Sequence, residues 1–302
     1  NRWKRSVENL AQKLHMGFFR TAYYRIEEAI KSLFLHSVVF EELGLRYIGP
    51  IDGHSIHALL DALEIARDSD RPIVVHVSTE KGRGYSFAEE QPEKWHGAPR
   101  FDIASGEPIA PPDKPGYSNI TGRVLERLAE TDKRIVAITA GMASGTGLSD
   151  FAKRFPDRFF DVGISEEHAV VFAAGLAAEG MIPVFAVYST FLQRSIDCVI
   201  HDVCLQDLPV IFCVDRAGIV GDDGPTHHGV FDIPLLRPVP GLVMMQPGDE
   251  AELARMLYTA VRLRKPVAIR YPRGAGRGVP IPESLSELPF GRAEVLRPGD
   301  EV

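Results

Sequence analysis

Short runs of apolar residues alternate with amphipathic segments along most of the chain. After residue 117 each apolar run is joined to the next by a segment with helical periodicity. The pattern predicts helices over 117–131, 147–154, 165–179, 190–205 and 249–263, and strands over 134–139, 158–162, 182–188, 209–214, 241–247 and 266–271. Short apolar strands separated by helices are typical of a parallel sheet covered on both faces. The sequence therefore predicts a doubly wound α/β domain.

A smaller α/β pattern precedes this domain. Residues 5–34 have a loose helical pattern, a helix ends at Gly44, and a short strand is predicted over 45–48. An amphipathic helix over 54–69 and a strand over 71–78 follow. Residues at i, i+3, i+4 and i+7 share one face of a helix, and here that face is apolar: Ile56, Leu59, Leu60, Leu63 and Ala66. Strand, helix and strand in this order predict a right-handed βαβ unit.

A proline-rich stretch separates the two patterns. Residues 98–116 contain five prolines and little periodicity, and we place a linker at 107–116. We expect the first α/β domain, which is incomplete, over 1–106 and the second over 117–289. The pattern changes near Gly291, so residues 290–302 are expected to begin a third domain. Because the chain begins with Asn and stops within a segment, we expect it to be a piece of a longer protein.

Composition excludes some classes of partner. The formal net charge is -7 and there is no long basic run, whereas binding to nucleic acid needs clustered Lys and Arg. No run of about 18 apolar residues indicates a membrane span, and no signal peptide is visible. The 3 cysteines include no CxxC pair, which favours core thiols in the reducing cytoplasm over a metal site.

Polar residues and glycines follow the predicted strands at their carboxyl ends, whereas the opposite ends carry ordinary turn residues. In open parallel sheets, ligands bind beyond the carboxyl ends of the strands. The sequence therefore predicts a site at this edge, built from some of these residues: Lys81, Arg83, Glu166, Glu167, His168, Phe191, Arg194, Arg216, Asp223, His227 and Arg273.

The connection "DRAGIVGDDGPTHHG" (215–229) is unusually long. Loops between elements have a median length of about 4–6 residues, and longer ones are usually functional or disordered. Arg216 and Arg273 follow neighbouring strands and could bind a phosphate together. Alternatively, they form surface ion pairs, which would contribute little to stability. A metal site at His227 and His228 is disfavoured, because adjacent side chains rarely point at one ion. Glu166 could simply be a carboxylate that the helix dipole stabilises at the start of a helix. Its helix, however, is apolar nearly all round and is predicted to be deeply buried.

Several motifs occur together and in order: "YIGPIDGH" (47–54), "KGRGY" (81–85), "WHG" (95–97), "FDVGISEEHAV" (160–170), "YSTFLQRSID" (188–197), the loop that begins at Asp215, and "RYPRG" (270–274). In this combination the chain closely resembles the 1-deoxy-D-xylulose-5-phosphate synthases, which are thiamine diphosphate enzymes of the transketolase superfamily. The resemblance covers nearly the whole chain and is weakest before about residue 38.

The resemblance implies a thiamine-diphosphate-binding fold and a reaction that joins pyruvate, with loss of CO₂, to D-glyceraldehyde 3-phosphate. The product feeds the synthesis of isoprenoid precursors, thiamine and pyridoxal phosphate. Glu166 matches the residue that hydrogen-bonds the aminopyrimidine of the cofactor, a role that suits a carboxyl in an apolar site. Phe191 matches the aromatic residue that stacks on the pyrimidine, and Ile164 and Lys81 match further cofactor contacts.

The resemblance also assigns residues to the acceptor substrate. Arg216 and Arg273 would bind its phosphate, with Tyr188 and Arg194 close by, and Asp223 and His227 would handle proton transfer. His96 would complete the site from the first domain. Relatives are homodimers, so a homodimer is expected.

One part of the family pattern is absent. The glycine-rich segment that holds Mg²⁺ and the diphosphate does not occur here. We therefore expect the metal ligands outside this chain, and no tight cofactor binding by the chain alone. Two alternatives remain: another enzyme of the superfamily, such as a transketolase or a 2-oxoacid dehydrogenase β-subunit, and a non-catalytic module that kept half a site.

Overall fold

A computed structural model describes residues 38–92, 94–98, 100–109, 114–292, 295 and 297–299. The helix predicted over 5–34 lies outside these residues, as do parts of the predicted linker and of the predicted third domain. The chain divides into two compact units, Asn1–His96 (unit 1) and Gly97–Val302 (unit 2).

Unit 1 contains the predicted βαβ motif. Strands β1 (Arg46–Asp52) and β2 (Ile73–Ser78) pair in parallel, and helix α4 (Ile56–Arg67) connects them. Helix α3 (Val38–Glu42), helix α5 (Ser86–Glu90) and the 3₁₀ helix η1 (Lys94–Gly97) complete its described elements. The apolar face predicted for α4 is not buried by the described residues, because Ile56, Leu60 and Leu63 are all more than half exposed.

Unit 2 contains the predicted doubly wound sheet. Its main helices are α6 (Tyr117–Thr131), α7 (Ser149–Arg154), α8 (Glu166–Ala178), α9 (Ser189–Leu192), α11 (Asp232–Leu236) and α12 (Glu250–Leu263). Its strands are β3 (Ile135–Thr139), β4 (Phe159–Asp161), β5 (Ile182–Tyr188), β6 (Ile211–Asp215), β7 (Val243–Met245) and β8 (Val267–Arg270). All pair in parallel in the order β4-β3-β5-β6-β8-β7, so every carboxyl end lies at the same edge of the sheet.

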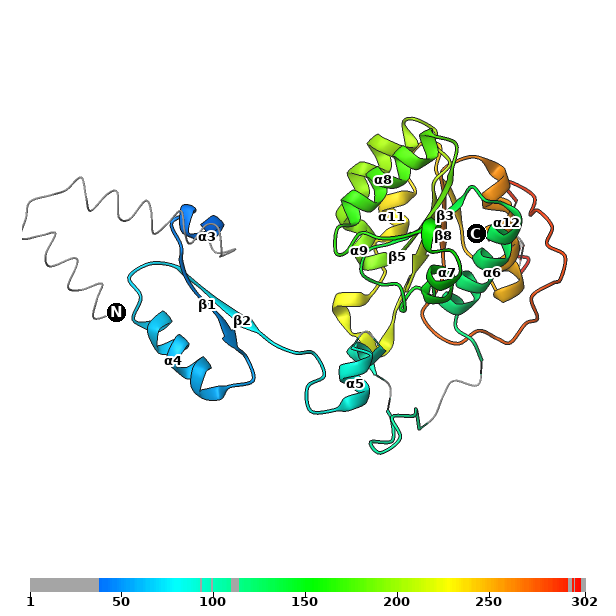
Figure 1. Cartoon of the computed structure of the whole chain (residues 1–302). Helices are drawn as coiled ribbons and strands as arrows, with labels where there is room; N and C mark the ends of the chain where they lie inside the picture. The colour runs from blue at the N-terminus through cyan, green and yellow to red at the C-terminus, as the bar shows by residue number, and fades with distance from the viewer. Residues whose placement is uncertain are drawn as a thin grey trace, which may run out of the picture. The chain divides into compact units, whose positions relative to one another are not determined.

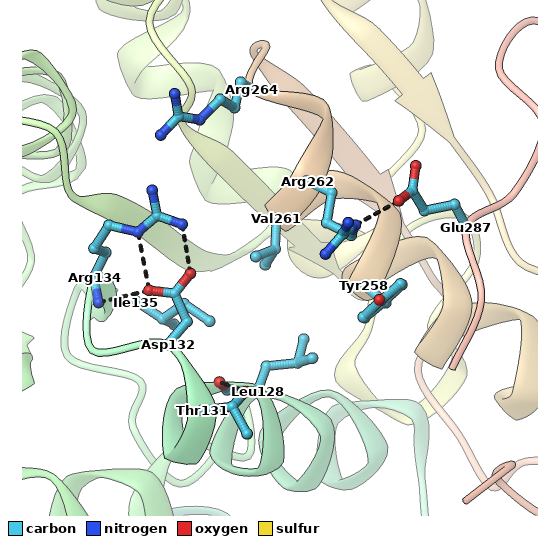
Figure 2. A pocket seen from close by; sticks show the side chains of 10 residues that line it. All are labelled: Leu128, Thr131, Asp132, Arg134, Ile135, Tyr258, Val261, Arg262, Arg264 and Glu287. Carbon is cyan, nitrogen blue, oxygen red and sulfur yellow. Dashed lines mark hydrogen bonds and ion pairs between the residues drawn. The ribbon is translucent and has the colours of Figure 1, made fainter. Parts of the chain in front are cut away.

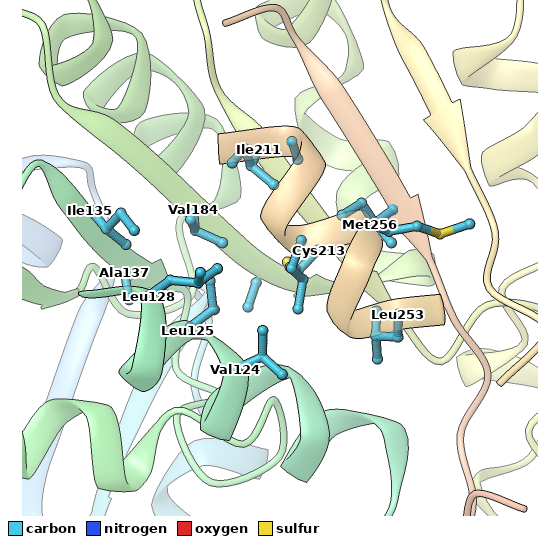
Figure 3. Close-up of a cluster of buried hydrophobic side chains, with 14 of the residues drawn as sticks. Val124, Leu125, Leu128, Ile135, Ala137, Val184, Ile211, Cys213, Leu253 and Met256 are labelled. Carbon is cyan, nitrogen blue, oxygen red and sulfur yellow. The ribbon is translucent and has the colours of Figure 1, made fainter. Parts of the chain in front are cut away.

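The core of unit 2 lies in two layers, one on each face of the sheet. Helices α6, α7 and α12 cover one face and α8 covers the other (Figure 1). Successive strand residues point to opposite faces: Val184 packs in the α6 layer, whereas Phe185 packs in the α8 layer. Figure 3 shows the first layer, in which Val124, Leu125 and Leu128 of α6 meet Leu253 and Met256 of α12. Burying such a side chain stabilises a fold by about 1.5–3 kcal/mol.

Several elements differ from the prediction. The single helix expected over 190–205 is divided into α9, the 3₁₀ helix η3 (Gln193–Ser195), α10 (Ile196–Cys198) and the π-helix η4 (Val199–Cys204). The break brings the side chain of Arg194 back to the start of α8. Helices α5 and α11 are too short for a periodicity and were not predicted. Among the described residues, no helix is long and apolar enough to cross a bilayer.

Candidate active site at the carboxyl ends of the strands

Glu166 is the first residue of α8, and its side chain is buried, with only 1% of the residue exposed. Its Oε1 accepts a hydrogen bond of 2.6 Å from Nη1 of Arg194. No described residue donates to Oε2. The Arg194 guanidinium also lies 4.9 Å from the centre of the Phe191 ring, a cation–π contact. The structure thus brings together a buried carboxylate, an arginine and an aromatic ring, as the sequence predicted.

A second cluster joins the ends of β5, β6 and β8. Tyr188 ends β5, and its ring lies 3.9 Å from the Arg216 guanidinium, which follows β6. Arg216 forms an ion pair with Asp223, and Arg273, which follows β8, reaches the same carboxylate with Nε at 3.3 Å. One acid therefore faces two arginines. Burial raises the pKa of the Tyr188 hydroxyl, although the nearby Arg216 opposes this shift.

Backbone hydrogen bonds join the two ends of the loop that follows β6. Gly218 and Gly229 exchange two backbone hydrogen bonds of 2.8 Å. A Cβ on Gly229 would lie 2.5 Å from the carbonyl oxygen of Arg216 and from Cβ of Ser189, so the close approach requires glycine. Arg273 donates to Val220 O at 3.2 Å and holds the loop from the other side. The long loop is therefore an ordered structure in which Asp223 is fixed.

The two histidines of the loop have different surroundings. His227 is half-buried, and its ring meets the Phe191 ring edge-on with centroids 5.5 Å apart. His228 Nδ1 accepts a hydrogen bond of 3.2 Å from the backbone N–H of Val220. His227 thus belongs to the aromatic cluster, and His228 stabilises the loop.

Asp215, the last residue of β6, was not singled out from the sequence. Its side chain is fully buried and accepts hydrogen bonds of 2.6 Å from Ser118 Oγ and from the backbone N–H of Arg216. Burial raises the pKa of Asp215 to about 6, against the lowering effect of the Ser118 hydrogen bond. Its position at a strand end, directly before Arg216, is the signal that could have identified it.

Two further connections surround the cluster. Asp161, at the end of β4, accepts hydrogen bonds from the backbone N–H groups of Gly141 (2.7 Å) and Gly163 (2.9 Å). The neighbouring Ile164 is 81% exposed. A Cβ on Gly145 would lie 1.8 Å from the Tyr188 hydroxyl oxygen, so the loop after β3 needs glycine there to pass this side chain.

Lys81 and His96 lie in unit 1. Lys81 Nζ and His96 Nδ1 are 2.8 Å apart, so the structure brings this predicted pair together. Within the described part of the chain, no three His, Cys, Asp or Glu side chains gather as a metal site would require. The placement of the Mg²⁺ ligands outside the chain stays a prediction.

A pocket lies at the opposite edge of the six-stranded sheet, before β3 and β8 (Figure 2). Arg134 binds Asp132 through two side-chain hydrogen bonds, and Arg262 forms an ion pair with Glu287. Arg264 lines the same pocket and is exposed. None of these residues was predicted to belong to the site.

Comparison with known proteins identifies the domain in unit 2. Residues 113–278 match the family model described as the transketolase pyrimidine-binding domain. The chain belongs to this family. Residues 1–79 match a second family model, described as 1-deoxy-D-xylulose-5-phosphate synthase. The resemblance predicted from the sequence motifs is thereby confirmed.

Curated relatives agree with both matches. The chain is 56% identical over 279 residues to a 1-deoxy-D-xylulose-5-phosphate synthase of Desulforudis audaxviator, with 92% of this chain and 44% of the relative covered. It is 50% identical over 305 residues to the synthase of Natranaerobius thermophilus, with 100% of this chain and 48% of the relative covered. The chain thus spans about half the length of the curated relatives it matches.

Solved structures place the pyrimidine-binding domain in the predicted fold class. A split-gene transketolase, an inactive beta4 tetramer, superposes with a TM-score of 0.51 at 30% identity, covering 61% of this chain and 59% of that one. Transketolase from Campylobacter jejuni gives a TM-score of 0.50 at 16% identity, covering 82% of this chain and 50% of that one. The second likeness shows the fold alone, and both agree with the prediction of an α/β, transketolase-like fold.

Proposed function

We propose that this chain forms the pyrimidine- and acceptor-binding part of a thiamine-diphosphate-dependent 1-deoxy-D-xylulose-5-phosphate synthase. The reaction would condense pyruvate with D-glyceraldehyde 3-phosphate and release CO₂. The observation that carries the proposal is the convergence of Glu166, Arg216 and Arg273 at one edge of a sheet. The 50–56% identity to curated synthases supports this reaction over others of the superfamily.

The residues around Glu166 suit a thiamine ring. A buried carboxylate with one oxygen free of protein donors can hydrogen-bond a ring nitrogen, and the half-buried Phe191 offers an aromatic face. When bound, thiamine diphosphate would supply the electron sink that permits loss of CO₂ from pyruvate. Glu166 would hold the pyrimidine and Phe191 would stack on it, with Ile164 and Lys81 as further contacts. Mg²⁺ is expected to bind through residues outside this chain.

The arginine cluster suits the phosphate of the acceptor. A guanidinium presents a planar fork of donors that matches phosphate oxygens. Arg216 and Arg273 share Asp223, so a phosphate that replaced this carboxylate would find two arginines already in place. Tyr188 and Arg194 would line the acceptor site, whereas Asp223, His227 and His96 would transfer protons. These roles rest on the family resemblance as well as on the contacts.

A second copy of the chain is the proposed partner. The outer face of α8 carries Val171, which is 48% exposed, and the partly buried Phe172, whose ring meets that of the 36% exposed Phe160 edge-on at 5.0 Å. Exposed apolar surface of this kind is typical of protein interfaces. We propose that it forms part of a homodimer. A cytoplasmic location is also proposed, since all three cysteines are free, as is usual for proteins of a reducing compartment.

The decisive experiment uses the complete protein. It is mixed with thiamine diphosphate, Mg²⁺, [2-¹³C]pyruvate and D-glyceraldehyde 3-phosphate, and the labelled carbon is followed by NMR. The expected result is a labelled C2 ketone of a deoxyxylulose phosphate. Unchanged pyruvate in the presence of folded protein would refute the proposal and favour the non-catalytic module. The 302-residue chain alone should not bind the cofactor tightly in the presence of Mg²⁺, which calorimetry can measure.

A further inference from the structure

The amino-terminal end of α6 contacts the residues that stand next to both arginines of the proposed phosphate site. On one side, Ser118 Oγ donates a hydrogen bond of 2.6 Å to Asp215, next to Arg216. On the other side, the N–H of Tyr117 donates to Gly274 O at 3.4 Å, next to Arg273. The N–H of Gly276 also donates to Pro115 O at 3.0 Å. A single helix end therefore links the two chain segments that carry the guanidinium groups.

Arg216 has an unusual backbone conformation. Its φ is +56°, in the left-handed region that residues with a Cβ seldom occupy. Such conformations persist only where the surrounding structure holds them. Here the Arg216 N–H is bound by Asp215 Oδ1 at 2.6 Å, and the other oxygen of that buried carboxylate is held by Ser118. The left-handed turn sets the direction in which the Arg216 side chain leaves the strand.

The direction of that side chain decides what it can bind. The guanidinium lies 3.9 Å from the centre of the Tyr188 ring and pairs with Asp223, beside Arg273. A shift of the backbone at Arg216 would separate the two arginines. Ser118 and Asp215 themselves are not predicted to contact a substrate, because Asp215 is fully buried, both its oxygens accept hydrogen bonds from the protein, and the Ser118 hydroxyl donates to it.

We propose that Ser118 and Asp215 are positioning residues that give the site its preference for a phosphorylated acceptor, by fixing the left-handed conformation of Arg216. This inference rests on the proposed function. It predicts a specific defect, because only the substrate phosphate uses Arg216, whereas the cofactor and pyruvate are handled by other residues. A general structural role would instead weaken turnover of every acceptor equally.

The test compares two acceptors with the complete protein: D-glyceraldehyde 3-phosphate and unphosphorylated D-glyceraldehyde. In Ser118→Ala and Asp215→Ala, kcat/KM for the phosphorylated acceptor should fall about tenfold or more, the size expected from losing a hydrogen bond to a charged group. The value for D-glyceraldehyde should change less than twofold. Asp215→Asn keeps an oxygen that can accept from the Arg216 N–H, so it should lose less than Asp215→Ala. Equal losses for both acceptors, or an unchanged preference, would overturn the proposal.

Matched controls come from the other end of the same helix. Thr131→Ala removes a hydroxyl that donates only to Leu128 O at 3.1 Å, and Asp132→Asn alters an acid that lies outside the proposed site. Both should leave the preference unchanged. Binding of inorganic phosphate, measured by calorimetry, gives a readout that does not depend on turnover. Parent protein should bind phosphate about tenfold more tightly than Ser118→Ala or Asp215→Ala, and equal affinities would refute the positioning role. If the parent binds phosphate in this way but converts neither acceptor, the proposed function fails and the positioning role stands.

Discussion

The two edges of the six-stranded sheet use the same kinds of residue in different ways. At the carboxyl edge, Arg216 and Arg273 converge on the single carboxylate of Asp223. At the opposite edge, Arg134 has its own partner in Asp132, and Arg262 has its own in Glu287 (Figure 2). The number of arginines therefore does not distinguish the two edges of the sheet.

Burial separates them. The side chains of Arg216 and Asp223 are 19% and 16% exposed, whereas those of Arg262 and Glu287 are both 55% exposed. The side chain of Arg273 is 40% exposed, close to the 45% of Arg134, so the contrast in burial rests on Arg216 and Asp223. Exposed ion pairs contribute about 0–1 kcal/mol, because water and salt screen them. The carboxyl edge is also held by the glycine-closed loop and by aromatic rings. Among the residues that line the pocket at the other edge, Tyr258 is the one aromatic residue. Convergence and burial, and not residue type, therefore mark the candidate site.

The largest expected effect comes from Glu166. In the complete protein, Glu166→Gln should lower kcat by about 10²–10⁴-fold, the usual contribution of a residue that assists proton transfer. Product formation followed by NMR measures it. Glu167→Gln is the matched control, since the neighbouring carboxylate is exposed. A kcat for Glu166→Gln within threefold of the parent would contradict the assignment of the active site to the carboxyl edge.

The next effect is a pH dependence of stability. Burial raises the pKa of Asp215 to about 6 in the folded chain, above the value of about 3.9 in an unfolded one. The folded state therefore holds the proton more tightly, and the stability from Asp215 is present below about pH 4 and lost as the pH rises through about 6. The loss should approach about 3 kcal/mol at 1.36 kcal/mol per pKa unit.

Urea unfolding of the 302-residue chain at several pH values measures this loss. The side chain of the Asp215→Asn variant cannot titrate. The difference in free energy of unfolding, parent minus variant, should therefore decrease as the pH is raised from 4 to 7.5. A difference that stays constant with pH would contradict the buried, titrating acid. Asp132→Asn provides the comparison, because the hydrogen bond from Arg134 lowers the pKa of Asp132 and gives the opposite sign.

Arg273→Ala should have a smaller effect, confined to the acceptor. Removal of one arginine from the pair should raise KM for D-glyceraldehyde 3-phosphate about tenfold, with little change in KM for pyruvate, since a charge-assisted hydrogen bond is lost. Steady-state kinetics of the complete protein measure both values. An equal rise in the two KM values would mean that Arg273 supports the loop, through its bond to Val220 O, and does not bind the phosphate.

Much of unit 2 follows from sequence periodicity. The predicted helices 117–131 and 165–179 lie within a residue of α6 and α8, and every predicted strand there is present. Helix α6 was predictable because its apolar face is buried by neighbours in the same chain, whereas α8, predicted to be deeply buried, keeps Val171 48% exposed. The apolar face of α4 was also recognised, but the described residues do not cover Ile56, Leu60 and Leu63. Periodicity identifies a face that should be buried but does not say what buries it.

The site was less predictable than the fold. Strand ends and family motifs pointed to Glu166, Arg216 and Arg273, whose roles stay predictions. Asp215 was not predicted because an acid at a strand end usually faces solvent, and the side chain that donates to its buried carboxylate, Ser118, lies 97 positions away in the chain. The need for glycine at 229 was equally hidden, since it arises from the approach of Ser189 and the Arg216 carbonyl. Contacts of this kind depend on the closed fold and leave no local pattern.

The smallest expected effect tests the opposite edge of the sheet. Arg134→Ala removes the hydrogen bonds to Asp132, so it should lower the free energy of unfolding by about 0–1 kcal/mol at neutral pH, as for other exposed pairs. The pair stabilises the chain only while Asp132 is ionised, and the deficit should therefore disappear as the pH falls. Turnover of both acceptors should stay within twofold of the parent. A tenfold loss of acceptor affinity in this variant would show that the two edges are coupled, and the separation drawn from burial and convergence would then be wrong.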